Sequence, residues 1–135
     1  LAAAPELSSK YQSLLQGIDS YMELIIIDDH PLFREGLKTI VNREEKYTVL
    51  AETGNGKEGV ALGKKHKPDI MLVDISMPGK NGIQLIRDLK EELPDTRFII
   101  ISMHSEADYI VEAFHAGATG YMIKESAASN LIKGI

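Results

Sequence analysis

The stretch Ile70 to Gly82 constrains the fold of this chain most strongly. Four apolar residues, Ile70 to Val73, lead into one carboxylate, Asp74, and a turn rich in proline and glycine follows. A short, continuously apolar run bounded by turn residues is typical of a strand buried on both faces of a parallel sheet. Ligands of such sheets bind at the carboxyl ends of the strands, where Asp74 is expected. Taken alone, this residue is better explained as an aspartate that caps the next loop.

The rest of the chain repeats the same strand-then-helix pattern. Short apolar strands are predicted at residues 24–27, 47–53, 70–73, 98–101 and 121–123. Helical stripes are predicted at about residues 31–42, 56–67, 82–93, 106–116 and 127–135. Five strands alternating with five helices indicate an α/β fold, a doubly wound parallel sheet with helices on both faces.

Composition narrows the class of protein. The 135 residues, 44% of them hydrophobic, fit one domain with its own core. A net charge of -5 argues against a nucleic-acid-binding surface in this segment. Cysteine is absent, which excludes disulfides and thiolate metal sites. No apolar run approaches the roughly 20 residues of a membrane span, so we expect a soluble, cytoplasmic domain with no membrane partner.

Residues 1–21 differ from the rest. They carry one apolar stripe, which predicts an additional N-terminal helix after Pro5. Met22 stands directly before the first buried strand, so we interpret it as a natural start and residues 1–21 as an appended extension; a native helical extension is the alternative. The final helix stops abruptly at Ile135, and we expect residues 22–135 to be one domain of a longer protein.

Polar residues stand at four of the five strand ends. The first strand delivers Asp28 and Asp29, the third Asp74, the fourth Ser102 and the fifth Lys124. In a parallel sheet these side chains meet at one edge. Three carboxylates in one cleft repel one another by about 1–4 kcal/mol per pair, and an oxygen-only ligand set suits a hard cation, so we expect Mg²⁺. A carboxylate nucleophile, a divalent cation, a lysine and a hydroxyl are the components of aspartyl-phosphate chemistry.

The motifs that carry these residues resemble the receiver domain of two-component response regulators. They are Ile-Ile-Ile-Asp28-Asp29-His-Pro, Asp74-Ile-Ser-Met-Pro-Gly-Lys-Asn-Gly, Ile-Ile-Ile-Ser102 and Gly-Ala-Thr-Gly-Tyr121-Met-Ile-Lys124. The resemblance covers about residues 23–135. The Asp-Asp-His-Pro opening and the Lys124-Glu125 pair are similar to the LuxR/NarL-type subfamily, whose output is a helix-turn-helix domain. The resemblance implies a flavodoxin-like sheet in the order 2-1-3-4-5.

The same resemblance implies a role for each matching residue. Asp74 is expected to be the phosphoacceptor. Mg²⁺ is expected to be held by Asp29 directly, by Asp28 largely through water, by Asp74 and by the backbone carbonyl of Ser76. Ser102 and Lys124 are expected to contact the phosphoryl group, and Tyr121 to be the aromatic switch residue. Ser76 and His104, each two residues after a site residue, are expected to tune the rate of hydrolysis.

The implied partners are a sensor histidine kinase, a second copy of the chain in a phosphorylation-dependent homodimer, and DNA through an output domain that this sequence lacks. A phosphatase with an aspartate nucleophile is an alternative, but such enzymes place a second acid where this chain has Ser76. A degenerate, phosphorylation-independent receiver is another, although those usually lose an acid or the lysine. We therefore expect a switch rather than a turnover enzyme.

Several of these residues also have simpler interpretations. Ser102 could satisfy backbone groups at a strand end, and Tyr121 could be an ordinary core or surface aromatic residue. We interpret His30 as the residue that starts the following helix rather than as a metal ligand, because a hard cation prefers oxygen. The family usually has a proline in cis after its lysine, and Glu125 occupies that position here, so a cis bond is not assured.

Overall fold

Strands and helices alternate along the whole described chain. The structure, a computed structural model, describes residues 21–135, so the helix expected within residues 1–21 lies almost entirely outside the described part. The elements in chain order are β1 Met22–Ile27, α2 Pro31–Asn42, β2 Tyr47–Thr53, α3 Gly56–His66, β3 Ile70–Val73, α4 Gly82–Leu89, β4 Arg97–Ser102, α5 Ala107–Ala116, β5 Gly120–Ile123 and α6 Lys124–Gly134. The predicted alternation is confirmed.

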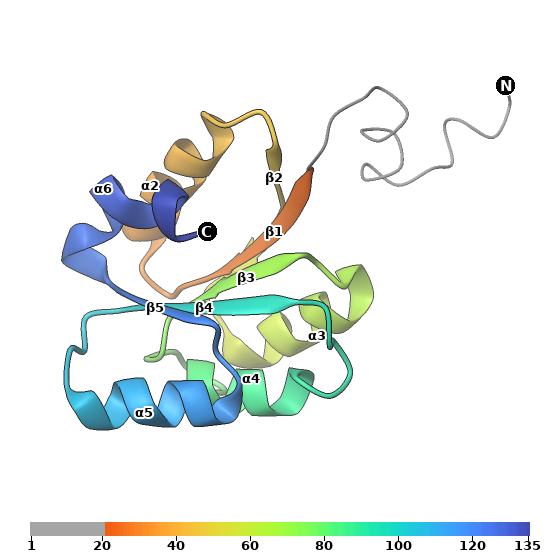
Figure 1. The fold of residues 1–135 in the computed structure, drawn as a ribbon. Helices are drawn as coiled ribbons and strands as arrows, with labels where there is room; N and C mark the ends of the chain where they lie inside the picture. Colours follow the sequence, from red (N-terminus) through yellow and green to blue (C-terminus); the bar gives the residue numbers. More distant parts are fainter. Residues whose placement is uncertain (1–20) are drawn as a thin grey trace, which may run out of the picture.

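The five strands form one parallel sheet in the order β2-β1-β3-β4-β5, as the resemblance implied. Figure 1 shows the sheet crossing the centre of the molecule. The register aligns the strand ends, because Ile27 of β1 lies beside Val73 of β3, and Val73 lies beside Ile100 of β4. The loops that leave these strands at their carboxyl ends therefore begin side by side.

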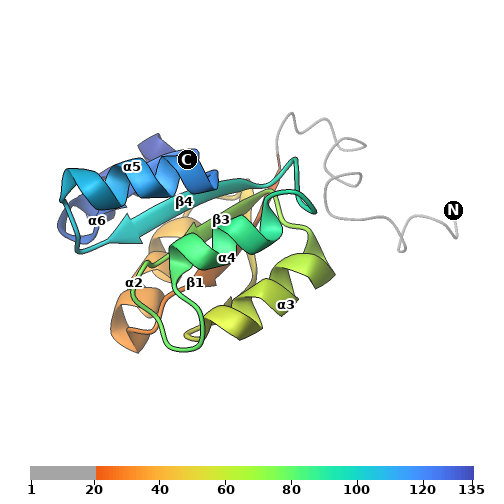
Figure 2. The same cartoon turned by 90° about the horizontal axis from the view of Figure 1, so that it is seen from below.

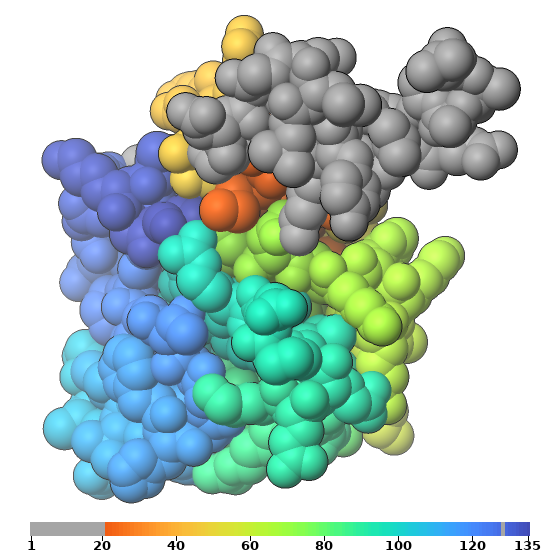
Figure 3. All heavy atoms as spheres, turned by 45° about the vertical axis from the view of Figure 1, so that its right-hand side comes forward, coloured from red at the N-terminus to blue at the C-terminus, as the bar shows by residue number. Residues whose placement is uncertain are grey.

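Helices cover both faces of the sheet, which explains why the three central strands, β1, β3 and β4, are mostly apolar. Alternate residues of β1 divide between two core clusters: Ile25 and Ile27 join one, and Leu24 and Ile26 join the other. The first cluster includes residues of α4 and α5, and α3 packs on α4 (Figure 2). The second cluster includes residues of α2 and α6, which pack on each other at the opposite face. In Figure 3 the residues of α3, the α4–β4 segment and α5 form one continuous surface.

The loop after β3 is held tightly against the strand end. Asn81 caps α4 in a reciprocal arrangement with Gln84, and the Gly82 N–H donates to the Ile75 carbonyl at 2.9 Å. A Cβ atom at Gly82 would lie 2.2 Å from the backbone oxygen of Asp74. Only glycine allows this approach, so the turn that follows Asp74 has a fixed path.

The start of the last helix is where the sequence prediction was wrong. We placed it near Ala127, but β5 ends at Ile123 and α6 begins at Lys124 with no loop between them. Proline is absent here, Ser126 donates a hydrogen bond from its hydroxyl to the Ile123 carbonyl at 3.0 Å, and nothing interrupts the helix. All described peptide bonds are trans, including the one between Lys124 and Glu125.

None of the helices within residues 21–135 is both long and apolar enough to cross a membrane.

Candidate functional site

Asp74 lies at the carboxyl end of the central strand β3. Its N–H donates to the Ile27 carbonyl of β1 at 2.8 Å, which continues the sheet ladder by one residue. The residue is 3% exposed, and its Oδ1 accepts a long hydrogen bond of 3.4 Å from the Ser76 N–H. The buried strand therefore presents one carboxylate in a defined position.

Asp28 and Asp29 follow the neighbouring strand β1. Asp28 is 1% exposed, and its Oδ1 accepts the His30 N–H at 2.8 Å. The Arg34 guanidinium, from the first turn of α2, donates to the Asp28 backbone carbonyl. The side chain of Asp29 is 33% exposed and forms the more open edge of the site.

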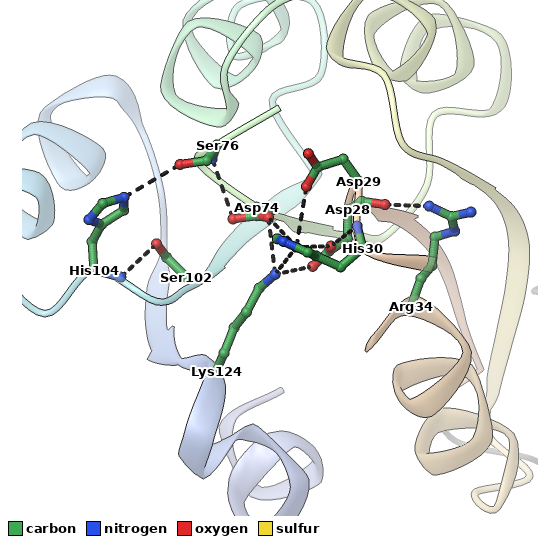
Figure 4. A network of polar contacts seen from close by, with 9 residues as sticks. All are labelled: Asp28, Asp29, His30, Arg34, Asp74, Ser76, Ser102, His104 and Lys124. Carbon is green, nitrogen blue, oxygen red and sulfur yellow. Dashed lines mark hydrogen bonds and ion pairs between the residues drawn. The ribbon is translucent and has the colours of Figure 1, made fainter. Parts of the chain in front are cut away.

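Lys124 brings a positive charge to these carboxylates. Its Nζ lies 2.9 Å from Asp28 Oδ2 and 3.1 Å from Asp74 Oδ2, and its side chain is only 9% exposed (Figure 4). The ammonium also lies 4.6 Å from the centre of the Phe33 ring, a cation–π distance. We call Asp28, Asp29, Asp74 and Lys124 the acid cluster. The structure brings these four together as the strand-end pattern predicted.

The acid cluster perturbs the ionisation of Asp74. Burial raises the pKa of the Asp74 carboxyl above its ordinary value of 3.8, and the neighbouring Asp28 charge raises it further. The Lys124 ammonium and the Ser76 N–H oppose the shift without cancelling it. Burial and the Asp28 charge together therefore outweigh the stabilisation that Lys124 gives to the Asp74 carboxylate.

His30 lies among the same groups. It precedes α2 in an extended conformation, as expected of a residue that starts a helix, but its side chain makes no capping hydrogen bond. Its Nδ1 lies 3.3 Å from an oxygen of Asp28, 3.3 Å from one of Asp29 and 3.7 Å from Asp74 Oδ2 (Figure 4). Lys124 Nζ is 2.9 Å from the same nitrogen.

Ser76, Ser102, His104 and Tyr121 form a second group, which we call the loop corner. The His104 N–H donates to Ser102 Oγ at 3.0 Å, and the His104 ring nitrogen Nε2 lies 3.4 Å from Ser76 Oγ (Figure 4). The Tyr121 hydroxyl donates to the His104 carbonyl at 2.7 Å. Ser102 is fully buried and here satisfies a backbone group, which is the simpler of its two interpretations.

Tyr121 is half-buried at the edge of the core. Its ring packs against the core cluster that contains Phe98 and Ile100, and burial raises the pKa of its phenol above 10.0. The ring of His104 stacks on Tyr109 of α5 at a centroid distance of 4.3 Å. The loop corner thus connects the end of β4 to α5 and β5.

The acid cluster fits a divalent cation by its own chemistry. Asp28 Oδ2 and Asp29 Oδ1 are buried and accept no hydrogen bond, although each faces a nitrogen atom. Oxygen atoms of Asp28, Asp29 and Asp74, with the ring nitrogen of His30, all lie within 4.8 Å of one another. Carboxylate oxygens without thiolates suit Mg²⁺ or Mn²⁺. The backbone carbonyl of Ser76 stays a predicted ligand.

Comparison with known proteins decides the family. The family model described as the response regulator receiver domain matches residues 24–135. This chain belongs to that family. The receiver domain is 38% identical over 117 residues to the transcriptional regulatory protein DegU of Brevibacillus brevis, covering 87% of this chain and 50% of the relative. It is 33% identical to the nitrate/nitrite response regulator NarL of Escherichia coli K12, covering 83% of this chain and 52% of NarL.

A solved structure shows the same fold. The LuxR-family two-component response regulator from Aurantimonas sp. SI85-9A1 superimposes with a TM-score of 0.80 at 33% identity, covering 84% of this chain and 81% of that one. The receiver domain is therefore of the LuxR/NarL type. It spans about half the length of the curated relatives it matches.

Two contacts of the receiver domain were not predicted from its sequence. Arg34 fixes the backbone of Asp28 and pairs with Glu52 of β2 at 2.8 Å. The ring of His30 turns into the acid cluster instead of pointing away from it. The position of His30 directly after two aspartates was the available signal for this orientation, and we discounted it because a hard cation prefers oxygen ligands.

The receiver domain also has a cavity beside the acid cluster. Its volume is about 510 Å³, and His30 and Lys124 line it together with apolar residues such as Phe33 and Ile123. The cavity therefore borders the acid cluster on the side of His30 and Lys124, and none of the three carboxylates lines it.

Proposed function

We propose that this receiver domain is a phosphorylation-driven switch that accepts a phosphoryl group on Asp74 from a sensor histidine kinase, with Mg²⁺ as cofactor. The observation that carries the proposal is the convergence of Asp28, Asp74 and Lys124 at the ends of three strands, where one ammonium pairs with two buried carboxylates. The membership of this chain in the receiver-domain family supports the same proposal.

The chemistry follows from the positions of the residues. A carboxylate oxygen of Asp74 attacks phosphorus, a P–O bond forms, and the P–N bond to the kinase histidine breaks; the electron pair returns to that imidazole. Lys124 Nζ, 3.1 Å from Asp74 Oδ2, is placed to contact the transferred oxygens. Asp28, Asp29, Asp74 and the Ser76 carbonyl would hold Mg²⁺, which supplies charge neutralisation when bound.

The conformational response is assigned to the loop corner. The new phosphoryl oxygens attract the Ser102 hydroxyl, and a displacement of its oxygen toward them would break the hydrogen bond that it accepts from the His104 N–H at 3.0 Å. The loop that carries His104 then moves, and with it the carbonyl that holds Tyr121. To change a 1:99 population into 99:1, the phosphoryl group must favour one state by about 5.5 kcal/mol.

Hydrolysis of the aspartyl phosphate resets the switch. Ser76 is exposed, and its contact with His104 at 3.4 Å joins the two loops beside Asp74, so these two side chains are placed to tune the approach of water. The domain turns over only its own phosphate and is no enzyme for external substrates. Ser76 stands where phosphatases with an aspartate nucleophile carry a second acid.

The same proposal includes the output of the switch, which is DNA binding. The relatives are transcriptional regulators about twice as long as the matched segment, so we assign DNA binding to an output domain outside this sequence. A phosphorylation-dependent homodimer is the expected assembly. Exposed apolar side chains on α5, Val111 and Phe114, are available for it.

Asp74→Asn tests the phosphoacceptor. Wild-type protein incubated with acetyl phosphate and Mg²⁺ is expected to gain the mass of one phosphoryl group in intact mass spectrometry, and Asp74→Asn is expected to gain none. Asp108→Asn, an exposed aspartate in the first turn of α5, is the matched control and should behave as wild type. Uptake by Asp74→Asn would refute the proposal.

A further inference from the structure

Arg34 contacts the acid cluster from outside it, and the proposed function makes no use of this contact. Its guanidinium Nη1–H donates a hydrogen bond to the backbone carbonyl of Asp28 (Figure 4). Its Nε–H donates to Glu52 Oε1 of β2 at 2.8 Å, and the side chain is only 19% exposed. One rigid, planar group therefore joins the carboxyl end of β1 to β2.

The two aspartates after β1 are held in different ways. The Asp28 N–H donates to the Thr53 carbonyl at 2.9 Å, and Asp28 Oδ1 accepts the His30 N–H at 2.8 Å. For Asp29, by contrast, Oδ1 is buried and accepts no hydrogen bond. The direction of the Asp29 carboxylate therefore depends on the path of the backbone between the two aspartates. Arg34 binds the carbonyl of the peptide bond that joins them.

The loop after β2 leaves room for this contact at Gly54. A Cβ atom at Gly54 would lie 3.1 Å from Asp29 Cα and 3.2 Å from Arg34 Nη1, so one of them would have to shift. It would also lie 3.4 Å from the Asp28 carbonyl oxygen. The loop therefore has its smallest residue where the guanidinium meets the peptide bond that it holds.

We propose that Arg34 is a positioning residue for the acid cluster: by holding the Asp28 carbonyl, it directs the Asp28 and Asp29 carboxylates toward the cation site. This inference rests on the proposed function and adds a residue that is not one of its ligands. Groups that orient metal ligands typically change metal affinity by about 10–100-fold when they are removed. Charge alone predicts the opposite sign, because loss of a positive charge near three carboxylates favours the binding of a cation. The direction of the change therefore separates positioning from electrostatics.

Calorimetric titration of the unphosphorylated protein with Mg²⁺ tests the inference without any phosphoryl donor. Arg34→Met keeps an apolar stem and removes both hydrogen-bond donors, so its Mg²⁺ Kd should rise by about tenfold. Lys38→Met is the matched control, because Lys38 lies in the same helix, has the same charge and pairs with the other oxygen of Glu52 at 2.6 Å. Its Kd should stay within about twofold of wild type or fall. An unchanged or lower Kd in Arg34→Met would overturn the inference.

Phosphorylation by acetyl phosphate separates positioning from a general loss of stability. In Arg34→Met the Mg²⁺ concentration that gives the half-maximal rate should rise by the same factor as the Kd. The rate at saturating Mg²⁺ should stay near that of the wild type, because the phosphoacceptor itself is unchanged. A lower saturated rate with an unchanged half-maximal concentration would mean that the variant only contains less folded protein, and it would overturn the inference.

Arg34→Lys carries the test if Arg34→Met does not fold. It keeps the charge but has one donor group for two acceptors, so it should bind Mg²⁺ more weakly than wild type, and a wild-type Kd would overturn the inference.

NMR spectra recorded in EDTA give a readout that needs no cation. The carbonyl ¹³C signal of Asp28 and the amide signal of Asp29 should move in the Arg34 variants and stay in place in Lys38→Met. Signals that do not move in the Arg34 variants would overturn the inference. If the wild type binds no Mg²⁺, the proposed cofactor fails, and these spectra alone decide whether Arg34 holds the peptide bond. Uptake of phosphate by Asp74→Asn would refute the phosphoacceptor and leave these results unaltered.

Discussion

The acid cluster and the loop corner lie side by side and are built in opposite ways. The acid cluster uses the ends of buried strands and charge: Asp28 and Asp74 are 1% and 3% exposed and share one ammonium. The loop corner combines two loop residues, Ser76 and His104, with Ser102 of β4 and Tyr121 of β5, and it uses neutral hydrogen bonds, mainly to the backbone of His104. The comparison teaches that the sheet fixes the acid cluster in place, while the loop corner rests on hydrogen bonds that are each weak.

Removing the Lys124 ammonium should have the largest effect on the stability of the domain. Lys124→Met leaves buried carboxylates without their counter-charge, so we expect the free energy of unfolding at neutral pH, measured in urea with EDTA, to fall by about 3–5 kcal/mol. Lys64→Met is the control, because Lys64 pairs with Glu92 at 3.5 Å on the surface and should change stability by less than about 1 kcal/mol. Similar losses in the two variants would show that the cluster is effectively solvated.

Neutralising Asp74 should have a smaller and opposite effect. Burial and the Asp28 charge raise the pKa of Asp74, so protonation of this carboxyl stabilises the folded state. The stabilisation is complete below pH 3.8, the ordinary pKa of the group, and is lost as the pH rises through the raised pKa. Asp74→Asn cannot ionise, so it should be more stable than wild type at pH 7 by about 1–3 kcal/mol, with the difference shrinking in acid.

Chemical unfolding of wild type and Asp74→Asn between pH 3 and 7 measures this difference, with Asp108→Asn again as control. Parallel stability curves for wild type and Asp74→Asn would contradict the assigned cause of the shift.

The smallest effect is expected in the loop corner. Tyr121→Phe removes one hydrogen bond, from the hydroxyl to the His104 carbonyl, and leaves the ring in the core. We expect a loss of about 0.5–1.5 kcal/mol in the free energy of unfolding, and faster amide hydrogen exchange around His104. Tyr109→Phe, on the exposed side of α5, is the matched control. A loss as large as that of Lys124→Met would mean that the loop corner is as rigid as the cluster.

Much of the fold and part of the site were predictable, for a physical reason. The apolar strands and the polar residues at their ends can be recognised from the hydrophobic pattern of the sequence alone. The parallel register then brings Asp28, Asp74 and Lys124 together. The ring orientation of His30 and the contacts of Arg34 were not predictable, because they depend on a side-chain torsion and on the path of α2. The start of α6 was placed three residues late, near Ala127, because Lys124, Glu125 and Ser126 are polar and show no apolar helical stripe.

The direct junction of β5 and α6 has a mechanical consequence. Lys124 follows the last residue of a strand and is the first residue of a helix, so no connecting segment can absorb displacement between them. A shift of α6 along its axis by one residue, about 1.5 Å, would move the lysine backbone by the same amount. The ammonium contacts at 2.9 and 3.1 Å would be strained or broken unless the side chain extended to compensate. A displacement of α6 against α2 would therefore change the position of the Lys124 ammonium relative to the Asp74 carboxylate.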